Sequence, residues 1–323
     1  MKFATAGAFA ALMLFGAICA AQPQQPFPTK PIRMIVGFTA GSEIDIVGRM
    51  IAQEMSGHWG HRVVVDNRTG AGGTVGAAIA ATAAPDGYTL LLNSVSHAAS
   101  QALYPKLPYD TLRDFAPVSQ ATSAPNVLLI APSRGIKSVK ELIAASRQKS
   151  GQANYGSAGV GSGTHITGEM FRLAAKLTVS HIPYKGVPEV LADTATGRIH
   201  YSFAPIGNAL PFVKDRRLLA LAVTTAARMP SLPDVPTVSE SAIPGFEWDQ
   251  WYGLFAPAKT PRAIVNLLSK EMARVLGLPQ IKERLAVRGS VAKASTPEQF
   301  EKFVRIEVQR IGKAIKDGGI SLQ

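Results

Sequence analysis

The chain has 323 residues, of which 46% are hydrophobic and 17% charged, with 34 Lys plus Arg, 22 Asp plus Glu and one Cys. The length favours two domains, because a single hydrophobic core rarely grows beyond about 250–300 residues, and the globular balance excludes wholesale disorder. A single cysteine excludes a disulfide scaffold. Basic residues are spread along the chain in runs of at most two, which indicates a solvated surface and no nucleic-acid partner.

The first 21 residues have the pattern of an export signal. Lys2 supplies a positive start, the following residues to Ala21 carry no charge, and the small residues around Cys19 suit signal-peptidase cleavage. A membrane anchor would need a longer apolar run. The alternative is a lipoprotein signal that uses Cys19, but Ile18 fits poorly before a lipidated cysteine. We therefore expect residues 1–21 to be removed near Ala21, which leaves an exported chain without a thiol.

Apolar runs alternate with helical spacing in the first part of the mature chain. The spacing predicts strands at 31–38, 62–66 and 88–93 and helices at 43–56 and 74–83. A strand–helix alternation of this kind is typical of parallel β-α-β units with right-handed crossovers. The sequence therefore predicts an α/β fold.

The alternation restarts near residue 126. Strands are predicted at 126–130, 153–155, 179–182, 199–204, 218–223 and 251–255, and helices from 138, at 163–176, 187–196 and 207–214, and from 261 and 297. The capping signals are Thr260 before Pro261 and Thr296 with Gln299. The Pro-rich segment 229–246 is predicted to be an ordered loop.

The last helices have no sheet of their own, so we expect them to return to the first domain. This predicts one lobe formed by residues 27–122 plus 250–323 and a second lobe formed by 123–249. The chain would cross between the lobes near 117–125 and 246–256, and these crossings would act as hinges.

Two strand-to-helix turns are rich in Gly and Ser, at residues 38–45 and 155–165. Ligands of open parallel sheets bind beyond the carboxyl ends of the strands, and the first N–H groups of a helix lack intrahelical partners. Each turn is therefore a candidate anion site, in which every charge-assisted amide hydrogen bond contributes roughly 1.5–3 kcal/mol. The alternative is that these glycines only form tight turns.

Nucleotide and hydrolase motifs are absent from these turns. No Lys follows the last Gly as a P-loop requires, and residues 70–76 miss the last Gly of GxGxxG. Neither Ser157 nor Ser162 has Gly on both sides at the spacing of a nucleophile elbow. His165 lies in the first turn of a predicted helix, where a structural role is the simpler interpretation.

His58 and His61 have the spacing of one helix face, but no third ligand lies nearby in the sequence. We therefore predict neither a metal site nor a cofactor.

Eight segments spread over nearly all of the mature chain carry a resemblance to one family. They are Pro31-Ile32-Arg33 and the segments 40–45, 63–77, 85–91, 155–165, 181–186, 219–237 and 244–261. With these segments the chain resembles the periplasmic receptors of tripartite tricarboxylate transporters, the Bug family. The resemblance implies a two-lobe periplasmic-binding-protein fold of the Venus-flytrap type, with mostly parallel sheets flanked by helices and two hinge crossings.

The resemblance also implies a function. It implies a periplasmic monomer that performs no chemistry, closes on one small carboxylate and presents it to the membrane permease subunits of a transporter or to a sensor. Mono-, di- and tricarboxylates, amino acids and aromatic acids all remain open as solutes. The alternative from another class is a secreted hydrolase acting on an acidic substrate, which would need a nucleophile with an oriented base.

The resemblance carries the family's binding residues over to two groups of positions. The expected carboxylate grip consists of Phe38, Thr39, Ala40, Gly41, Ser42, Glu43, Asp45, Ser157, Ala158, Gly159, Val160, Gly161, Ser162 and His165. The expected contacts with the distal end of the solute are Ser94, Ser96, His97, Pro205, Ile206 and Gly207.

Glu43 departs from the family pattern. The usual Pro-Ala-Gly-Gly is replaced by residues 39–42, Thr-Ala-Gly-Ser, and an acid follows directly. An acid beside an anion site is repulsive unless it faces solvent or meets a cation. We expect Glu43 either to face solvent or to bind an ammonium group of an amino-acid-like solute.

Overall fold

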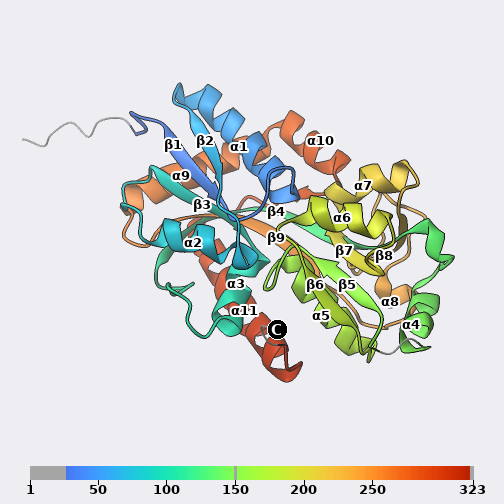
Figure 1. Cartoon of the computed structure of the whole chain (residues 1–323). Coiled ribbons are helices and arrows are strands. Elements are labelled where there is room, and N and C mark those ends of the chain that lie inside the picture. The colour runs from blue at the N-terminus through green and yellow to red at the C-terminus, as the bar shows by residue number, and fades with distance from the viewer. Residues whose placement is uncertain (1–26, 149–150, 321–323) are drawn as a thin grey trace, which may run out of the picture.

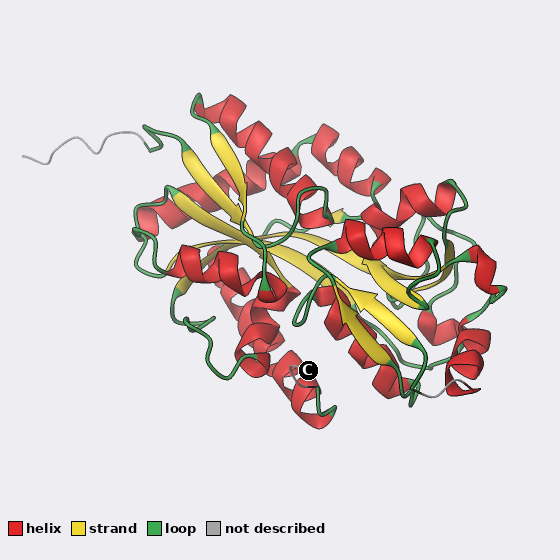
Figure 2. Ribbon diagram, viewed as in Figure 1, coloured by secondary structure: helices red, strands yellow, loops and turns green. Residues whose placement is uncertain are grey.

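The computed structural model describes residues 27–148 and 151–320, so the predicted export signal with Cys19 and Ala21 lies outside the described residues. In this part of the chain, ten strands form one continuous sheet (Figures 1 and 2). The strands are β1 (Ile32–Val36), β2 (Val63–Asn67), β3 (Thr89–Ser94), β4 (Phe115–Ile130), β5 (Asn154–Ser157), β6 (Ser180–Pro183), β7 (Tyr201–Pro205), β8 (Leu219–Val223), β9 (Asp249–Pro257) and β10 (Val291–Ala292). Their order is β2-β1-β3-β9-β4-β7-β5-β6, and β8 and β10 also pair with β4.

Helices cover both faces of the sheet. They are α1 (Glu43–Trp59), α2 (Thr74–Ala81), α3 (Val95–Leu103), α4 (Val139–Gln148), α5 (Gly163–Ala174), α6 (Val187–Ala195), α7 (Ile206–Lys214), α8 (Val238–Ser241), α9 (Arg262–Gly277), α10 (Pro279–Val287) and α11 (Pro297–Asp317). Met34 and Val36 pack in one apolar cluster with α1, α6, α7, α9 and α10. Ile35 packs in the other cluster with the remaining helices. Successive residues of a strand point to opposite faces, so both faces are buried.

Two long strands join the two ends of the sheet. Residues 115–125 of β4 pair with β9, and residues 126–130 pair with β7 and β8. These pairings are antiparallel, as is the pairing of β9 with β3, whereas β1 pairs in parallel with β2 and β3, and β5 with β6 and β7. The sheet is therefore mixed. The predicted strand at 126–130 is only the end of β4, because residues 115–125 pair with a strand distant in the sequence.

Several short elements escaped sequence prediction. Helix α3 follows β3 directly, with Ser94 as an N-cap that accepts a hydrogen bond from the amide of Ser96. Helix α10 begins with Pro279 two residues after α9 ends, between the two helices predicted to start at 261 and 297. The segment 229–246, predicted to be a loop, contains α8. Helix α8 has four residues and β10 has two, which is too few for a periodic signal.

Two helix N-caps were predicted in the C-terminal part of the chain, and one of them forms. Thr296 and Gln299 form the predicted capping box at the start of α11, so this prediction is confirmed. The prediction for Thr260 is wrong. Pro261 occupies the N-cap position of α9 without a side-chain cap bond, and the buried Thr260 hydroxyl has no partner among the described residues.

Helix α11 packs against α3 and β4, beside the strands of the first part of the chain. The Phe300 ring is fully buried and lies against Gly253 of β9, where an added Cβ atom would approach it to 2.1 Å. The ring thereby fills the space that the missing side chain of Gly253 leaves over the sheet.

Replacement of Phe300 by Ala is expected to lower the free energy of unfolding by about 3–5 kcal/mol, since it leaves a cavity between α11 and β9. Urea unfolding monitored by circular dichroism measures the change. Phe303→Ala is the matched control, because Phe303 is only partly buried and should cost less. Equal losses for both variants would contradict this placement of the core.

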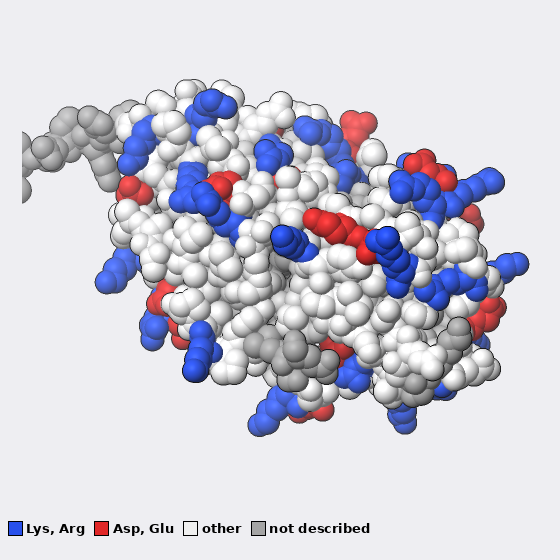
Figure 3. Space-filling view, in the orientation of Figure 1, with Lys and Arg blue, Asp and Glu red and all other residues white. Residues whose placement is uncertain are grey.

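Charged side chains are scattered over the face shown in Figure 3, with Lys and Arg interspersed with Asp and Glu. No helix in residues 27–148 and 151–320 combines the length and apolar character that crossing a bilayer requires.

Candidate functional site

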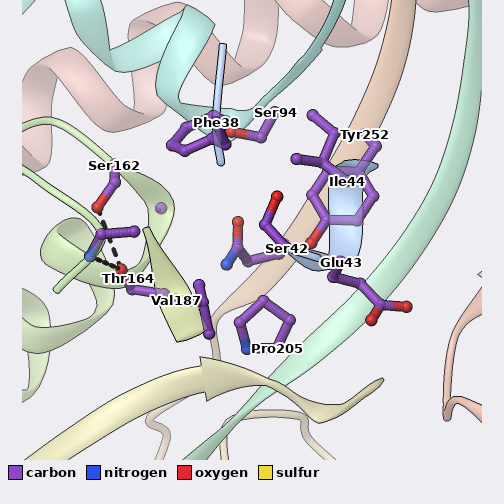
Figure 4. Close-up of a pocket in the computed structure, with 13 residues that line it drawn as sticks. Phe38, Ser42, Glu43, Ile44, Ser94, Ser162, Thr164, Val187, Pro205 and Tyr252 are labelled. Atoms are coloured by element: carbon purple, nitrogen blue, oxygen red, sulfur yellow. Dashed lines mark hydrogen bonds between the residues drawn. The ribbon is translucent and has the colours of Figure 1, made fainter. Parts of the chain in front are cut away.

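A small cavity of about 30 Å³ lies where the two Gly- and Ser-rich turns meet (Figure 4). It is lined by Phe38, Ser42, Glu43, Ile44, Ser94, Ala158, Ser162, Gly163, Thr164, Val187, Pro205, Gln250 and Tyr252. The two turns thus share one cavity although they are more than a hundred residues apart in sequence. One water needs roughly 10–15 Å³ of this kind of volume, so the cavity admits a group of about the size of a carboxylate.

Five helices begin at this cavity. Glu43, Gly163 and Val187 are the first residues of α1, α5 and α6, and Ser94 and Pro205 are the N-cap residues of α3 and α7. Each helix follows a strand of the sheet, so the carboxyl ends of β1, β3, β5, β6 and β7 all point here. A helix N-terminus carries roughly half a positive charge, and five of them create an environment that favours an anion.

Among the described residues that line the cavity, Glu43 alone is charged, and it is neutralised by Arg288. Arg288 Nε donates to Glu43 Oε1 at 2.9 Å, and Arg288 Nη2 lies 2.5 Å from Oε2. The Glu43 side chain is fully buried and points away from Ser162 and Thr164 (Figure 4). The hydrogen bond to Glu43 raises the pKa of Arg288. Our expectation for Glu43 is therefore corrected: it neither faces solvent nor presents a free carboxylate, because a cation from α10's end meets it.

Asp45 shapes the first turn and does not line the cavity. It accepts hydrogen bonds from the Gly41 amide at 2.9 Å, from Arg49 and from Asn67. Burial alone would raise the pKa of Asp45, but these hydrogen bonds outweigh burial and lower it. Thr39, Ala40 and Gly41 also lie outside the lining, so this turn meets the cavity through Phe38 and residues 42–44.

The start of α1 keeps part of its donor capacity for a ligand. Ser42 makes no side-chain cap bond to the helix, because its hydroxyl donates to the Thr39 carbonyl at 2.7 Å. The Glu43 amide donates to Asn208 Oδ1 at 2.7 Å. The following amide, that of Ile44, belongs to the first turn of a helix and has no intrahelical partner.

The second turn uses many of its amides internally. Five of them donate within the turn, those of Ala158, Gly159, Gly161, Ser162 and His165. These internal hydrogen bonds leave fewer amides of the second turn for a ligand than the predicted grip by amides and hydroxyls would use. The donors that remain at the cavity are the first amides of α5, at Gly163 and Thr164, and the hydroxyls of Ser162 and Thr164, which lie 3.1 Å apart.

Two histidines form hydrogen-bond contacts with residues of the second turn. His165 Nδ1 accepts from the Gly161 amide at 3.2 Å, and His181 Nε2 lies 2.6 Å from Ser157 Oγ. The two rings lie 4.3 Å apart between centroids. Burial lowers the pKa of His165 to about 4 and that of His181 to about 3. Both rings are therefore neutral at pH 7, as their roles as hydrogen-bond partners require.

Ser157 and His181 lie within hydrogen-bonding distance, as a nucleophile and its general base would. Ser157 is fully buried and lies outside the cavity lining. No acidic side chain of the described residues bonds to His181, so the ring lacks the third group that orients a general base. Gly159 and Val160 do not line this cavity but a second one of about 420 Å³, beside Gly70, Gly72 and Lys185. Ala158 lines both cavities, so the second lies next to the first.

Of the six residues expected to contact the distal end of the solute, two line the cavity and four do not. Ser94 and Pro205 line the cavity, whereas Ser96, His97, Ile206 and Gly207 do not. His97 lies in an aromatic cluster with Tyr109, Phe115 and Phe255, and burial lowers its pKa to about 3.

Six lining residues were not among the predicted positions: Ile44, Gly163, Thr164, Val187, Gln250 and Tyr252. Gly163 and Thr164 lie within the Gly- and Ser-rich segment, so helix-start geometry was the signal available for them. Gln250 and Tyr252 come from β9, which pairs with β3 and β4. Burial, followed by the charge of Glu43, raises the pKa of Tyr252 well above its usual value, so its hydroxyl stays a donor.

Comparisons with known proteins agree with this architecture. The sequence profile described as "Tripartite tricarboxylate transporter family receptor" matches residues 47–320. Protein BugT of Bordetella pertussis is 33% identical over 299 residues, which cover 92% of this chain and 92% of BugT.

Two solved structures from Rhodopseudomonas palustris share the fold. Rpa4515, determined with adipate, is 33% identical with a TM-score of 0.88 and is matched over 92% of this chain and 100% of that one. MatC, determined with malate, is 31% identical with a TM-score of 0.86 and is matched over 90% and 100%. The predicted periplasmic-binding-protein fold and the predicted resemblance are thus confirmed, and the chain belongs to the tripartite tricarboxylate transporter receptor family.

Proposed function

We propose that this protein captures a small carboxylate in the cavity between the two turns and delivers it to the permease of a tripartite tricarboxylate transporter or to a sensor. The observation that carries the proposal is the convergence of five helix N-termini on a cavity where Glu43, the only charged residue in the lining formed by residues 27–148 and 151–320, is already paired. An anion there would meet donors and helix dipoles without an opposing free charge.

The carboxylate would be held mainly by neutral donors. The amides of Ile44, Gly163 and Thr164 come from helix starts, and the hydroxyls of Ser162 and Tyr252 lie on opposite sides of the cavity. Hydrogen bonds to an ionised acceptor are stronger than neutral ones, so several of them suffice without an arginine. The adipate and malate in the two R. palustris proteins support a carboxylate as the ligand class.

Capture would require the two lobes to move. We propose that residues 27–122 plus 250–323 and residues 123–249 rotate about β4 and β9, the two strands that run between them. The cavity of about 30 Å³ has room for a carboxylate head but not for a longer solute, so the lobes would part to admit one. A solute that contacts both lobes would then favour closure by its differential affinity for the closed state.

A carboxylate library tested by thermal shift and calorimetry, with each acid paired with its carboxamide, would test the proposal. We expect acids to bind and amides not to bind, and a ligand at 100 times its Kd adds about 2.7 kcal/mol of stability. Recovery of unchanged ligand after incubation would separate a receptor from a hydrolase. Equal binding of acids and amides, or no binding by any acid, would contradict the proposal.

Thr164→Val is expected to weaken carboxylate binding about 10–100-fold, because it removes a hydroxyl at the cavity that also accepts the Ala158 amide at 3.0 Å. Calorimetric titration measures the change. Thr178→Val serves as the control, since Thr178 is exposed and lies outside the cavity lining. An unchanged Kd in Thr164→Val would place the carboxylate elsewhere.

A further inference from the structure

A row of buried hydrogen bonds next to the cavity fixes the orientation of the Gln250 side chain. It starts at Thr167, whose Oγ1 lies 2.8 Å from the carbonyl oxygen of Gly163. Two oxygens at this distance need a proton between them, and only the hydroxyl carries one, so Thr167 donates to Gly163. The same Thr167 oxygen lies 2.7 Å from the amide group of Asn126, and toward Asn126 it can act only as an acceptor.

The direction of these hydrogen bonds determines which end of Gln250 is used. Asn126 donates from Nδ2 to Thr167, which leaves Asn126 Oδ1 to accept from Gln250 Nε2 at 3.0 Å. Reversal of either side-chain amide would bring two acceptors together at one of these contacts. Asn126 and Thr167 are fully buried, so water does not compete for their hydrogen bonds. The nitrogen of the Gln250 amide is therefore committed to the protein.

The carbonyl end of the Gln250 side chain has no hydrogen bond. No donor in residues 27–148 and 151–320 reaches Gln250 Oε1, although Gln250 is buried and lines the cavity. A Cβ atom added at Gly163 would lie 2.1 Å from this oxygen, so it lies beside the start of α5. Gly163 supplies one of the amides proposed to hold the carboxylate. An acceptor without a donor thus lies directly beside the proposed carboxylate donors.

Ser42 adds a second acceptor at the same cavity (Figure 4). Its hydroxyl proton is used in the hydrogen bond to the Thr39 carbonyl at 2.7 Å, so its oxygen can only accept from a ligand. An ionised carboxylate brings acceptors alone and would satisfy neither of these oxygens. Because a buried acceptor without a donor is costly, the cavity favours a solute with a hydrogen-bond donor close to its carboxylate.

The charges around the cavity favour a neutral donor over a cation. Five helix N-termini point to the cavity, and their partial positive charges disfavour an ammonium group. Glu43 offers no compensation, because Arg288 already pairs with it. A hydroxyl donates without a charge. Since Gln250 Oε1 lies beside Gly163, the hydroxyl must be on the carbon next to the carboxylate.

We propose that Gln250 selects 2-hydroxy acids: its Oε1 accepts a hydrogen bond from the hydroxyl next to the carboxylate that α5 holds. Asn126 and Thr167 are positioning residues, because they line no part of the cavity and act through the orientation of Gln250. This selection rests on the proposed function, since it requires the carboxylate to bind in this cavity. It adds the chemical class of the solute to that proposal.

Calorimetric titration of wild type with matched acids would test the selection. The probes are malate with succinate, 2-hydroxyadipate with adipate, and lactate with propionate and 2-fluoropropionate, and the better-bound enantiomer of each chiral acid is compared. A site that hydrogen-bonds a hydroxyl rejects the analogue without it, because the acceptor then stays unpaired. We expect each hydroxy acid that binds to do so at least about tenfold more tightly than its parent acid. Malate should also bind more tightly than aspartate, which has an ammonium group in place of the hydroxyl.

Gln250→Met removes the acceptor and keeps a side chain of similar length. We expect hydroxy acids and their parent acids to bind this variant with Kd values within about twofold of each other, because the group that distinguishes them is gone. Equal weakening of both acids, with the wild-type ratio retained, would show that Gln250 has only a structural role. Gln280→Met is the matched control, since Gln280 is exposed on α10 and lies outside the cavity lining. It should keep the wild-type ratio.

The outcomes separate this inference from the proposed function. The selection is overturned if wild type binds hydroxy and parent acids equally, if 2-fluoropropionate binds as well as lactate, or if aspartate binds more tightly than malate. Each of these results leaves carboxylate capture intact. Absence of binding by every acid overturns both proposals. The wild-type titrations need no variant, so they decide the question even if Gln250→Met fails to fold.

Discussion

Replacement of Gly163 by Ala is expected to weaken carboxylate binding at least about 100-fold, or about 2.7 kcal/mol. A Cβ atom at this position would lie 2.1 Å from Gln250 Oε1 and 2.8 Å from Val95 Cγ1. Gln250 cannot easily move aside, because it is buried and its Nε2 donates to Asn126 at 3.0 Å. The start of α5 would be pushed from β9, and with it the donors at the cavity. Overpacking should also lower the free energy of unfolding by about 1–3 kcal/mol.

The matched control is the same substitution at Gly57 of α1. Nothing lies within 4 Å of a Cβ atom added there, and the position is helical. Gly57→Ala should therefore raise stability by about 0.5–1 kcal/mol, since Gly is unfavourable inside a helix, and should leave the Kd unchanged. Calorimetry and urea unfolding of the two variants measure both effects. Wild-type affinity in Gly163→Ala would show that α5's start does not contact the solute.

Stability is expected to fall steeply as the pH drops below about 6.5. Burial lowers the pKa of His97 to about 3, of His165 to about 4 and of His181 to about 3. An unfolded histidine titrates near 6.5, so between about pH 6.5 and 4 the unfolded chain binds protons that the folded chain does not. The contribution of these neutral rings is complete above pH 6.5 and is lost as the pH falls, at up to about 4 kcal/mol per pH unit for the three together. Urea unfolding at pH 7.5, 6 and 5 measures the slope.

The variant His97→Phe isolates one of these rings. His97 Nε2 is buried without a hydrogen-bond partner in the part of the chain that the structure describes, so an apolar ring can replace it without loss of a strong bond there. We expect near-wild-type stability at pH 7.5 and a slope smaller by about 1.4 kcal/mol per pH unit. A slope identical to that of wild type would mean that His97 titrates alike in the folded and unfolded chains.

The helices and strands next to the cavity were largely predictable from local pattern. The predicted helices at 43–56, 187–196 and 207–214 correspond to α1, α6 and α7. Apolar periodicity and glycine-rich turns are encoded within ten or fifteen residues, which is why such segments can be assigned without tertiary information. The full length of β4 and the short elements α8 and β10 were missed, since they exist only because a partner strand or layer is present.

The positions of the two turns were also predictable, but which of their amides donate within the turn and which remain for a ligand was not. The rule for parallel sheets predicts that each turn lies at the carboxyl end of its own strand. The two turns reach one cavity because the antiparallel strands β9 and β4 join the two parallel parts of the sheet. Which amides would remain for a ligand depended on internal partners such as Thr164 and His165, which the sequence places nearby without indicating where their side chains point.

The order of the β-α-β units, the two glycine-rich turns and the absence of cysteine from residues 20–323 were determined by the sequence itself, because each is a property of neighbouring residues. Only the tertiary structure decided which groups Glu43 contacts. Its cation comes from Arg288, 245 residues further along the chain, and its amide meets Asn208, 165 residues away. Contacts over such separations arise when the folded sheet brings distant strand ends together, and no local pattern in the sequence specifies which side chains will then face each other.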